Sequence, residues 1–372
     1  MKIADNVKRH LNEQTRLFSL GVGHDVNSRL LDKLSSICLG QTMYVRPGEP
    51  LDNIISQLYD RIGAPALTDA KLQLTVGGKE GRTRQIYPSE MYDLFSGDQL
   101  VIVGRYRKPG ELKIKLTGKF MGKKQEYVFE DEFPKETGSG RNVFVERLWA
   151  TRRIGQIIDD IDLYGENQEL VDELITLSKK HGILTPYTAY LAEEKTDLND
   201  LSRGRRVAQG NLEQLREEAG ELAFRQRDFK SQLKSAGRAM QADAAVEDSF
   251  GGLGGRGSGF ATPGPAGNAP SPAGPRPNAA TKPSKYQAVK QIGGRTFFYK
   301  KDRYIDSGAS DDQIAKAVEL EQFSDDYFDL IGKLGERSKA FLAESTKLLV
   351  LIDGKAYLIV PPAAKPASPV KP

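Results

Sequence analysis

The chain has 372 residues, of which 38% are hydrophobic and 28% are charged, and its formal net charge is +4. This length suffices for two or three domains, and a charge so close to neutral predicts neither a nucleic-acid-binding protein nor a membrane-surface protein. A single cysteine, Cys38, excludes an intrachain disulfide and a cysteine-based zinc cluster, and three scattered histidines disfavour a histidine-rich metal site.

The first residues do not form the apolar segment of a signal peptide, and no run reaches the roughly 18 apolar residues that span a bilayer. If Met1 is the true start, this predicts a cytoplasmic protein without a membrane span.

Residues 1–47 carry the pattern of an α/β unit. A helix over 4–14 precedes a strand over 17–22, and Asp25 or Asn27 is placed to cap a helix that buries Cys38. The glycines at 21 and 23 resemble a phosphate-binding loop, but the third glycine and a Gly-Lys-Ser/Thr sequence are missing. Nucleotide binding is therefore disfavoured.

Residues 48–136 predict a helix from Pro50 to Arg61, followed by an antiparallel β module of five or six strands. From 66 to 133, apolar and polar residues alternate between Gly, Pro and Asp turns, which is typical of half-buried strands.

The β module contains a locally basic strip that is our candidate interaction surface. Its members are Arg105, Arg107, Lys113, Lys115, Lys119, Lys123 and Lys124. One interpretation is a surface for nucleic acid or another polyanion. We favour the solvated face of a hairpin, because the lysines fall opposite the apolar positions.

Residues 137–195 predict two helices, at 142–163 and after the capping residue Asn167, that brace the β module. In this interpretation His181 lies at the helix end and Gly182 terminates the helix. The acidic residues Asp159, Asp160 and Asp162 are interpreted as a solvated helix face rather than a catalytic carboxylate pair.

The remaining segments differ in composition. Residues 196–248 are charged and helical, and apolar residues with heptad spacing over 211–241 predict a weak coiled coil or one amphipathic helix that lies on a partner. The Gly/Pro-rich segment 249–284 predicts a disordered linker. A small α+β module over 285–361 contains helices near 311–320 and 325–345 and a hairpin turn at Asp353-Gly354, and a disordered tail follows over 362–372.

Several stretches together resemble the bacterial relatives of inter-alpha-trypsin inhibitor heavy chains. The longest is RLWATRRIGQIIDDIDLYGENQELVDELITLSKKHGILTPYTAYLAEE at 147–194, and the others are YPSEMYDLFSGDQLVIVGRY, RLFSLGVGHDVNSRLLDKLS and GGRTFFYKKDRYIDSG. The resemblance implies a vault/inter-alpha-trypsin domain, a von Willebrand factor type A domain and a C-terminal region. It identifies residues 16–35 as the last strand and helix of the type A domain.

The type A family holds a divalent cation through an Asp-x-Ser-x-Ser motif, and this sequence has no such motif after an early strand. Asp25 does not match a ligand position, so we predict no metal, no cofactor and no catalytic residue. The resemblance then implies the C-terminal part of a longer protein, whose type A domain is reduced to its last βα unit.

These observations predict an α+β fold: a type A remnant, a braced β module, a linker and a small C-terminal module. The resemblance implies a non-enzymatic interaction, adhesion or scaffold protein, at the cell envelope or outside the cell if residues are missing before Met1. We expect a protein partner, with self-association through an exposed sheet edge or the 211–241 helix, and no specific nucleic acid. Polyanion binding through residues 105–124 is the alternative.

Overall fold

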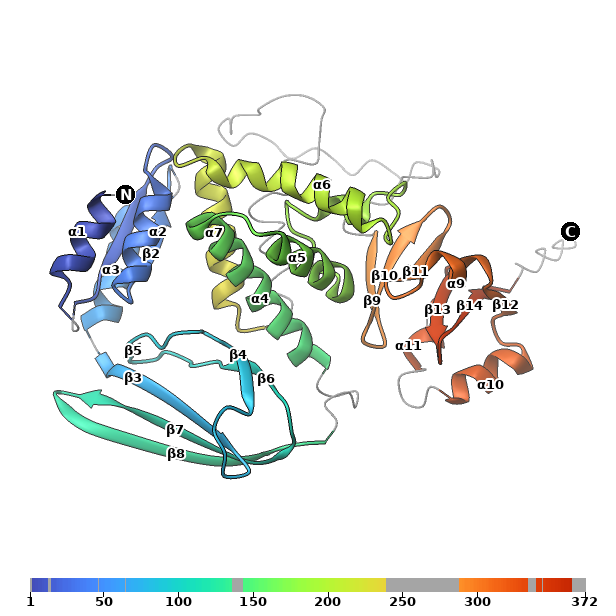
Figure 1. Ribbon diagram of the computed structural model, residues 1–372, viewed down its shortest axis with the longest axis horizontal. Coiled ribbons are helices and arrows are strands. Elements are labelled where there is room, and N and C mark those ends of the chain that lie inside the picture. The colour runs from blue at the N-terminus through green and yellow to red at the C-terminus, as the bar shows by residue number, and fades with distance from the viewer. Residues whose placement is uncertain are drawn as a thin grey trace, which may run out of the picture.

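The computed structural model describes residues 2–12, 15–45, 47–63, 65–135, 143–238, 288–333, 339–342 and 344–362. The linker predicted over 249–284 and residues 363–372 of the predicted tail lie outside the described residues. The described part is a mixed α+β fold with several sheets, as predicted (Figure 1).

The N-terminal unit is built around two parallel strands. Its elements are α1 (Lys2–His10), β1 (Phe18–Val22), α2 (Ser28–Ile37), β2 (Gln41–Val45) and α3 (Leu51–Gly63), and β1 pairs in parallel with β2. Of the two candidate caps, Asn27 is the one that acts, because its Oδ1 accepts a hydrogen bond from the Leu30 amide at 2.9 Å. Cys38 is buried as predicted, and burial raises the pKa of its thiol.

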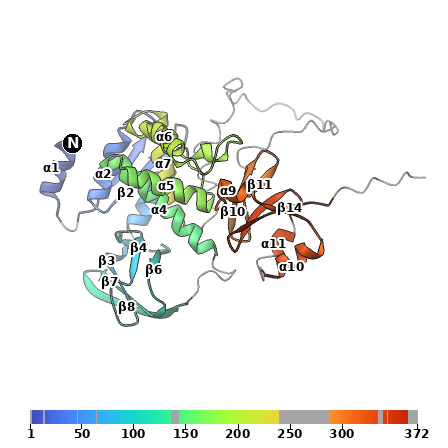
Figure 2. The same cartoon turned by 45° about the vertical axis from the view of Figure 1, so that its right-hand side comes forward.

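The β module has the predicted alternation and six described strands. They are β3 (Pro65–Val76), β4 (Thr83–Tyr87), β5 (Leu94–Phe95), β6 (Val103–Tyr106), β7 (Gly110–Phe120) and β8 (Lys123–Phe133). Four form a sheet of order β5-β3-β7-β8, and β4 pairs separately with β6. Two views place β7 and β8 at the outer margin of the molecule, away from the helices (Figures 1 and 2).

The largest hydrophobic core lies among the helices. These are α4 (Val143–Tyr164), α5 (Gln168–His181), α6 (Leu201–Leu212) and α7 (Glu221–Ser235), with short 3-10 helices η1 (Ala189–Ala192) and η2 (Glu213–Arg216). The predicted caps of α5 are confirmed: Asn167 accepts from the Glu169 amide at 2.8 Å, and Gly182 adopts the left-handed conformation. Phe144, in the first turn of α4, is exposed.

The segment 211–241 is not one helix. Its described residues form the end of α6, then η2, and then α7 after a break at Gly220. Phe229, Leu233 and Ala236 belong to the core of the same chain. The apolar face that predicted a separate partner is thus covered by α4, and the last three residues of the predicted segment, 239–241, lie outside the described residues.

The C-terminal module is a six-stranded sheet with short helices, in the order β12-β14-β13-β11-β10-β9. Its strands are β9 (Val289–Ile292), β10 (Arg295–Lys300), β11 (Arg303–Asp306), β12 (Val318–Glu321), β13 (Leu348–Ile352) and β14 (Lys355–Val360). Its helices are α9 (Asp311–Ala315), α10 (Asp325–Lys333) and α11 (Lys339–Leu342). The predicted helix near 311–320 is therefore too long, since β12 replaces its second half, whereas the Asp353-Gly354 turn is confirmed.

The C-terminal module is docked on the helical core at the end of α5. Thr296 Oγ1 donates to the Lys180 carbonyl at 2.6 Å, and Gln291 Nε2 donates to the His181 carbonyl at 2.8 Å. Phe298 of β10 belongs to the same core cluster as the helices. None of the helices within the described ranges has the length and apolar character needed to cross a bilayer.

Candidate functional site

The β7–β8 ribbon exposes its outer strand, β8, along almost its whole length. A two-residue turn, Met121-Gly122 with positive φ at both positions, joins the strands, and their pairs run without a break from Phe120↔Lys123 to Gly110↔Phe133. Positive φ at both turn residues matches the right-handed twist of paired strands. All residues of β8 except Gln125 and Phe133 are exposed.

The two faces of the ribbon differ in character because side chains alternate along each strand. One face carries Leu112, Ile114 and Leu116 of β7 opposite Asp131, Phe129 and Tyr127 of β8. Among the described residues, the hydrophobic core clusters include Tyr87 and Val103 of β4 and β6 but none from β3, β7 or β8. Tyr127 and Phe129 are accordingly 45% and 55% exposed.

The other face carries lysines, and three of these are paired with acids. Lys113 Nζ lies 3.7 Å from Glu130 Oε1, Lys115 Nζ lies 3.0 Å from Glu126 Oε2, and Lys119 Nζ lies 2.8 Å from Asp69 Oδ2. The hydrogen bond from Lys119 is the main cause that lowers the pKa of Asp69.

Of the other four residues of the predicted strip, only Lys124 shares this face. Arg105 on β6 places its guanidinium 5.0 Å from the ring centroid of Trp149 on α4, and the Arg107 amide donates to the Arg82 carbonyl at 2.8 Å. Lys123 and Lys124 begin β8, where alternation points them to opposite faces. The structure therefore gathers Lys113, Lys115, Lys119 and Lys124 on one face and separates the other three from them.

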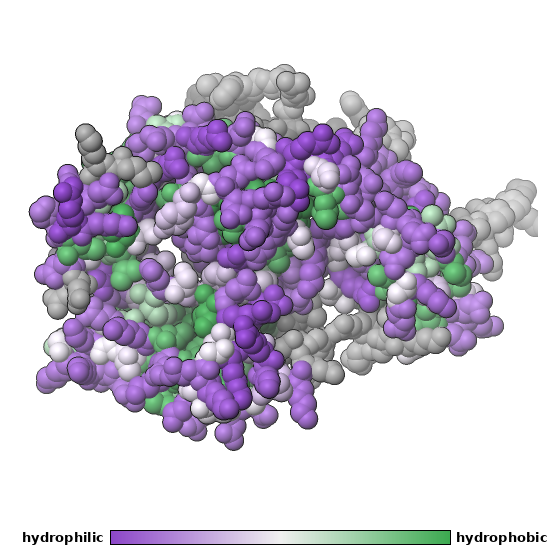
Figure 3. All heavy atoms as spheres, viewed as in Figure 1, coloured by the Kyte–Doolittle hydropathy of each residue, from purple (hydrophilic) through white to green (hydrophobic). Residues whose placement is uncertain are grey.

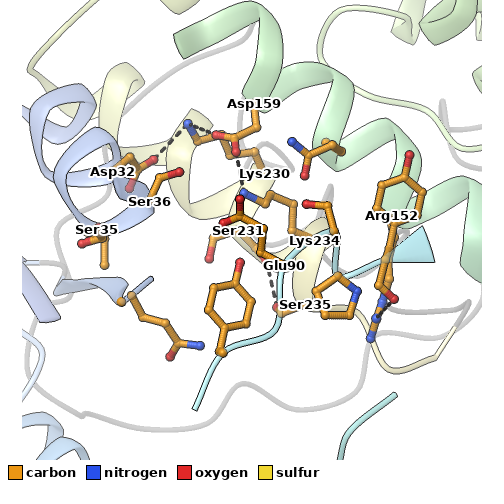
Figure 4. Close-up of a pocket in the computed structure, with 18 of the residues that line it drawn as sticks. Asp32, Ser35, Ser36, Glu90, Arg152, Asp159, Lys230, Ser231, Lys234 and Ser235 are labelled. Carbon is orange, nitrogen blue, oxygen red and sulfur yellow. Dashed lines mark hydrogen bonds and ion pairs between the residues drawn. The ribbon is translucent and has the colours of Figure 1, made fainter. Parts of the chain in front are cut away.

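A polar cavity of about 370 Å³ lies where the N-terminal unit, the loop after β4, α4 and α7 meet (Figure 4). Hydroxyl side chains line it, among them Ser35, Ser36, Thr42, Ser231 and Ser235. Its charged lining consists of Asp32, Glu90, Arg152, Asp159, Lys230 and Lys234. Figure 3 shows hydrophobic residues gathered between the helices and the β3–β5 side of the sheet.

The cavity wall includes part of a buried charge cluster that joins α2, α4 and α7. Lys230 Nζ lies 2.9 Å from Asp32 Oδ2, 2.9 Å from Asp159 Oδ1 and 2.7 Å from Asp162 Oδ2. Asp162 is 1% exposed, and it also contacts Arg227 at 3.1 Å and Arg29 at 3.5 Å. Because each buried charge has opposite charges beside it, the cluster satisfies the condition for burying ions.

The electrostatics of the cluster follow from these contacts. Burial alone lowers the pKa of Lys230, but the three carboxylates outweigh burial and raise it overall. Burial likewise raises the pKa of Asp159, and Lys230 and Lys234 outweigh it in the opposite direction. Both groups are held in their charged forms, so neither is suited to donating or accepting a proton near neutral pH.

This cluster corrects the interpretation of Asp159 and Asp162 as a solvated helix face. Both side chains are buried, whereas Asp160 between them is partly exposed and accepts a hydrogen bond from Gln156 at 2.8 Å. The missed signal was the Arg227–Lys230–Lys234 spacing, which puts three cations on one side of a helix that also carries the apolar stripe.

The loop between β1 and α2, which resembles a phosphate-binding turn in sequence, is contacted by the segment that precedes α7. The Ser28 amide at the start of α2 donates to the Glu218 carbonyl at 3.0 Å, and the Gly220 amide donates to the His24 carbonyl at 2.7 Å. The His24 ring packs edge-on against Phe224 of α7 at a centroid distance of 5.3 Å.

His181 lies at the helix end, as predicted. Burial is the main cause that lowers the pKa of its imidazole to about 4, and neighbouring Lys180 adds to the shift. Within the described ranges, no group of three or more His, Cys, Asp and Glu side chains is arranged to hold a metal ion.

Comparison with known proteins adds distant relatives. No family model matches the sequence. It is 23% identical over 206 residues to the inter-alpha-trypsin inhibitor heavy chain H2 of Mesocricetus auratus, a match that covers 52% of this chain and 21% of that protein. It is 25% identical over 234 residues to heavy chain H4 of Bos taurus, covering 57% of this chain and 25% of that protein.

A solved von Willebrand factor type A structure from Catenulispora acidiphila matches 52% of this chain and 56% of that chain, with 15% identity and a TM-score of 0.28. The chain spans 21% of the length of heavy chain H2 and 25% of the length of heavy chain H4. Over about half of its own length, it is therefore distantly similar to inter-alpha-trypsin inhibitor heavy chains.

Proposed function

We propose that this chain is a non-enzymatic protein-interaction module that binds an extended segment of a partner polypeptide along the β8 edge. The observation that carries the proposal is the exposure of β8 along almost its whole length at the end of a four-stranded sheet. An edge strand offers unpaired N–H and C=O groups, and an added strand satisfies them while side-chain contacts supply specificity.

Two further observations support an interaction role. The similar proteins are named as heavy chains of an inhibitor, which fits a component of an assembly. Four charged groups of the polar cavity pair with one another, namely Asp32, Asp159, Lys230 and Lys234, which disfavours acid–base chemistry by these groups. We also propose, from the sequence resemblance alone, that β1, α2 and β2 correspond to the last part of a type A domain.

The charges along β8 indicate which kind of polypeptide segment it would bind. β8 begins with Lys123 and Lys124, and the acidic residues Glu130, Asp131 and Glu132 come just before its last residue, Phe133. An antiparallel ligand strand must therefore be basic near its N-terminus and acidic near its C-terminus to place opposite charges side by side.

A synthetic peptide tests this function. The peptide alternates threonine and valine, begins with two lysines and ends with two glutamates, and its control carries N-methyl groups on the amides of one edge. We expect saturable binding of the first peptide by fluorescence anisotropy, with slower hydrogen exchange of β8 amides. Equal binding of the methylated peptide, or protection confined to residues outside β8, would overturn the proposal.

A further inference from the structure

The outward-facing backbone groups of β8 follow from its register with β7. Hydrogen-bonded pairs alternate along an antiparallel ladder, and the pair Phe120↔Lys123 closes the two-residue turn. The odd-numbered residues of β8 therefore bond to β7, and the backbone of Lys124, Glu126, Val128 and Glu130 faces outward. The Glu132 amide agrees with this assignment, because it turns away from β7 and donates to Asp131 Oδ1 at 2.8 Å.

We propose that β8 pairs with β8 of a second copy of this chain, antiparallel and about a twofold axis at Tyr127. This inference rests on the strand-addition function proposed above and names its partner. The two sheets would join into one continuous sheet across the axis, and the interface would be isologous, as twofold symmetry requires.

Charge selects this partner and this register. With Tyr127 on the axis, Lys124 lies opposite Glu130 of the second copy, and Lys123 lies opposite Asp131 of the second copy. Both arrangements occur twice by symmetry. Moving the axis to Val128 would instead set Glu126 against Glu130, a repulsive pair. Parallel pairing would align lysines with lysines and acids with acids.

The register also places the remaining side chains of β8 opposite compatible partners. Tyr127 faces its own copy across the axis, and Val128, which is 44% exposed, lies beside Glu126 of the second copy. Glu132, whose amide is already bonded to Asp131, falls opposite the turn residue Gly122 and needs no partner strand. Met121, which is 87% exposed, falls opposite Phe133 of the second copy, whose ring stacks on Tyr106 at 4.2 Å.

Cysteine cross-linking tests the register. At a non-hydrogen-bonded pair the Cα atoms lie about 4.5 Å apart, which allows a disulfide, whereas diagonal neighbours lie about 7–8 Å apart. Under mild oxidation we expect Y127C to form a covalent dimer, and V128C, the matched control, to form none. The parent chain controls for Cys38, which is buried. Efficient cross-linking of V128C, or none by Y127C, would overturn the proposed register.

Charge exchange tests the pairing without a cysteine. K124E sets a carboxylate against Glu130 of the second copy, so we expect the dimer dissociation constant in analytical ultracentrifugation to rise about tenfold or more. The double variant K124E/E130K restores opposite charges and should recover the dimer. Recovery is a result that a folding defect cannot produce.

The failure of this inference can be told apart from the failure of the proposed function. A chain that remains a monomer at tens of micromolar, yet binds the alternating peptide along β8, overturns the homodimer and leaves the interaction function standing. A chain that neither dimerises nor binds the peptide overturns both. V128P should abolish both interactions, because its proline removes an outward amide without removing a bond to β7, whereas V128A should keep them.

Discussion

At the residue scale, the charges buried between α2, α4 and α7 matter more for stability than the exposed ion pairs of the β7–β8 ribbon. Lys113, Glu130, Lys115 and Glu126 keep much of their solvent, so each of these pairs contributes roughly 0–1 kcal/mol. Asp162 has no such compensation from water, because its side chain is fully buried among Arg227, Lys230 and Arg29. Loss of one partner leaves an uncompensated buried charge.

Asp162→Asn tests this point. We expect the free energy of unfolding to fall by about 3–5 kcal/mol, because the amide leaves Arg227 and Lys230 buried with one carboxylate fewer. Chemical denaturation measures the change. Asp160→Asn, at a partly exposed position on the same helix, should stay within about 0.5 kcal/mol of the parent. Equal effects of the two variants would contradict the burial argument.

His181 predicts a pH dependence. The pKa of its imidazole is lowered from 6.5 to about 4 by burial first and Lys180 second, so the unfolded chain protonates before the folded one. Above pH 6.5 both states are neutral; below it, stability is lost as the pH falls toward 4, by on the order of 3 kcal/mol. His181→Gln should flatten this slope in denaturant titrations at several pH values, while His10→Gln, at an exposed position, should leave it.

Local chemistry made some residues predictable and others not. Asn27, Asn167 and Gly182 act on backbone groups within a few positions, so their roles could be predicted from the sequence around them. The burial of Asp162 depends on Lys230, which is 68 positions away. Sequence spacing alone could not show that the two would meet.

At the element scale, the packing of α4 on α7 depends on a glycine. A Cβ at Gly155 would lie 2.8 Å from Leu233 Cβ and 2.9 Å from the Lys234 amide nitrogen. Gly155→Ala should therefore lower the free energy of unfolding by about 1–3 kcal/mol through overpacking. Gly210→Ala, where nothing lies within 4 Å, should instead raise it by about 0.5–1 kcal/mol. Thermal or chemical unfolding of both variants measures these changes. A Gly155→Ala variant that is more stable than the parent would contradict the close approach of α4 to α7 at this position.

The lysines of the ribbon give a second prediction at this scale. Because Lys113, Lys115 and Lys119 are paired with acids, we expect heparin and single-stranded DNA to bind weakly, without the steep salt dependence of phosphate contacts. Titrations at two salt concentrations measure this. Tight low-salt binding that K123A/K124A abolishes would support the polyanion alternative instead.

Elements with strong periodicity were predicted well, but the elements against which they pack were not. The alternation over 66–133 predicted the strands, because a half-buried strand needs that pattern wherever it lies. The apolar spacing over 211–241 was equally clear, but the same stripe suits a partner helix or a neighbour in the chain. The burial of Phe229 and Leu233 in the core shows that the stripe packs against a neighbouring helix of the same chain.

At the scale of the whole molecule, the C-terminal module and the helical core form one body although the 239–287 segment separates them in sequence. Lys300 of β10 shows how closely they fit: its Nζ donates to the Leu191 carbonyl at 2.8 Å and also to the Glu193 carbonyl. Burial lowers the pKa of this amine to about 8. The sequence predicted a separate module at 285–361, but no local pattern indicated where it would dock.

Cleavage of the connecting segment tests this arrangement. With a protease site inserted between Gly257 and Ser258, we expect the two fragments to co-elute in size-exclusion chromatography after cutting, because Thr296, Gln291 and Lys300 hold them together. Lys300→Ala should promote separation, since it leaves buried carbonyls unpaired, while the exposed Lys301→Ala should not. Fragments of the parent chain that separate at micromolar concentration would contradict the docking.

The capping of α5 by the C-terminal module also has a consequence for synthesis. The Lys180 carbonyl receives its partner from Thr296, which is 116 positions later in the chain. At about 5–20 residues per second, the ribosome needs on the order of ten seconds to add that stretch. During translation, the free carbonyls in the last turn of α5 are hydrogen-bonded to water. Side chains of β9 and β10 replace this water only when the final module emerges.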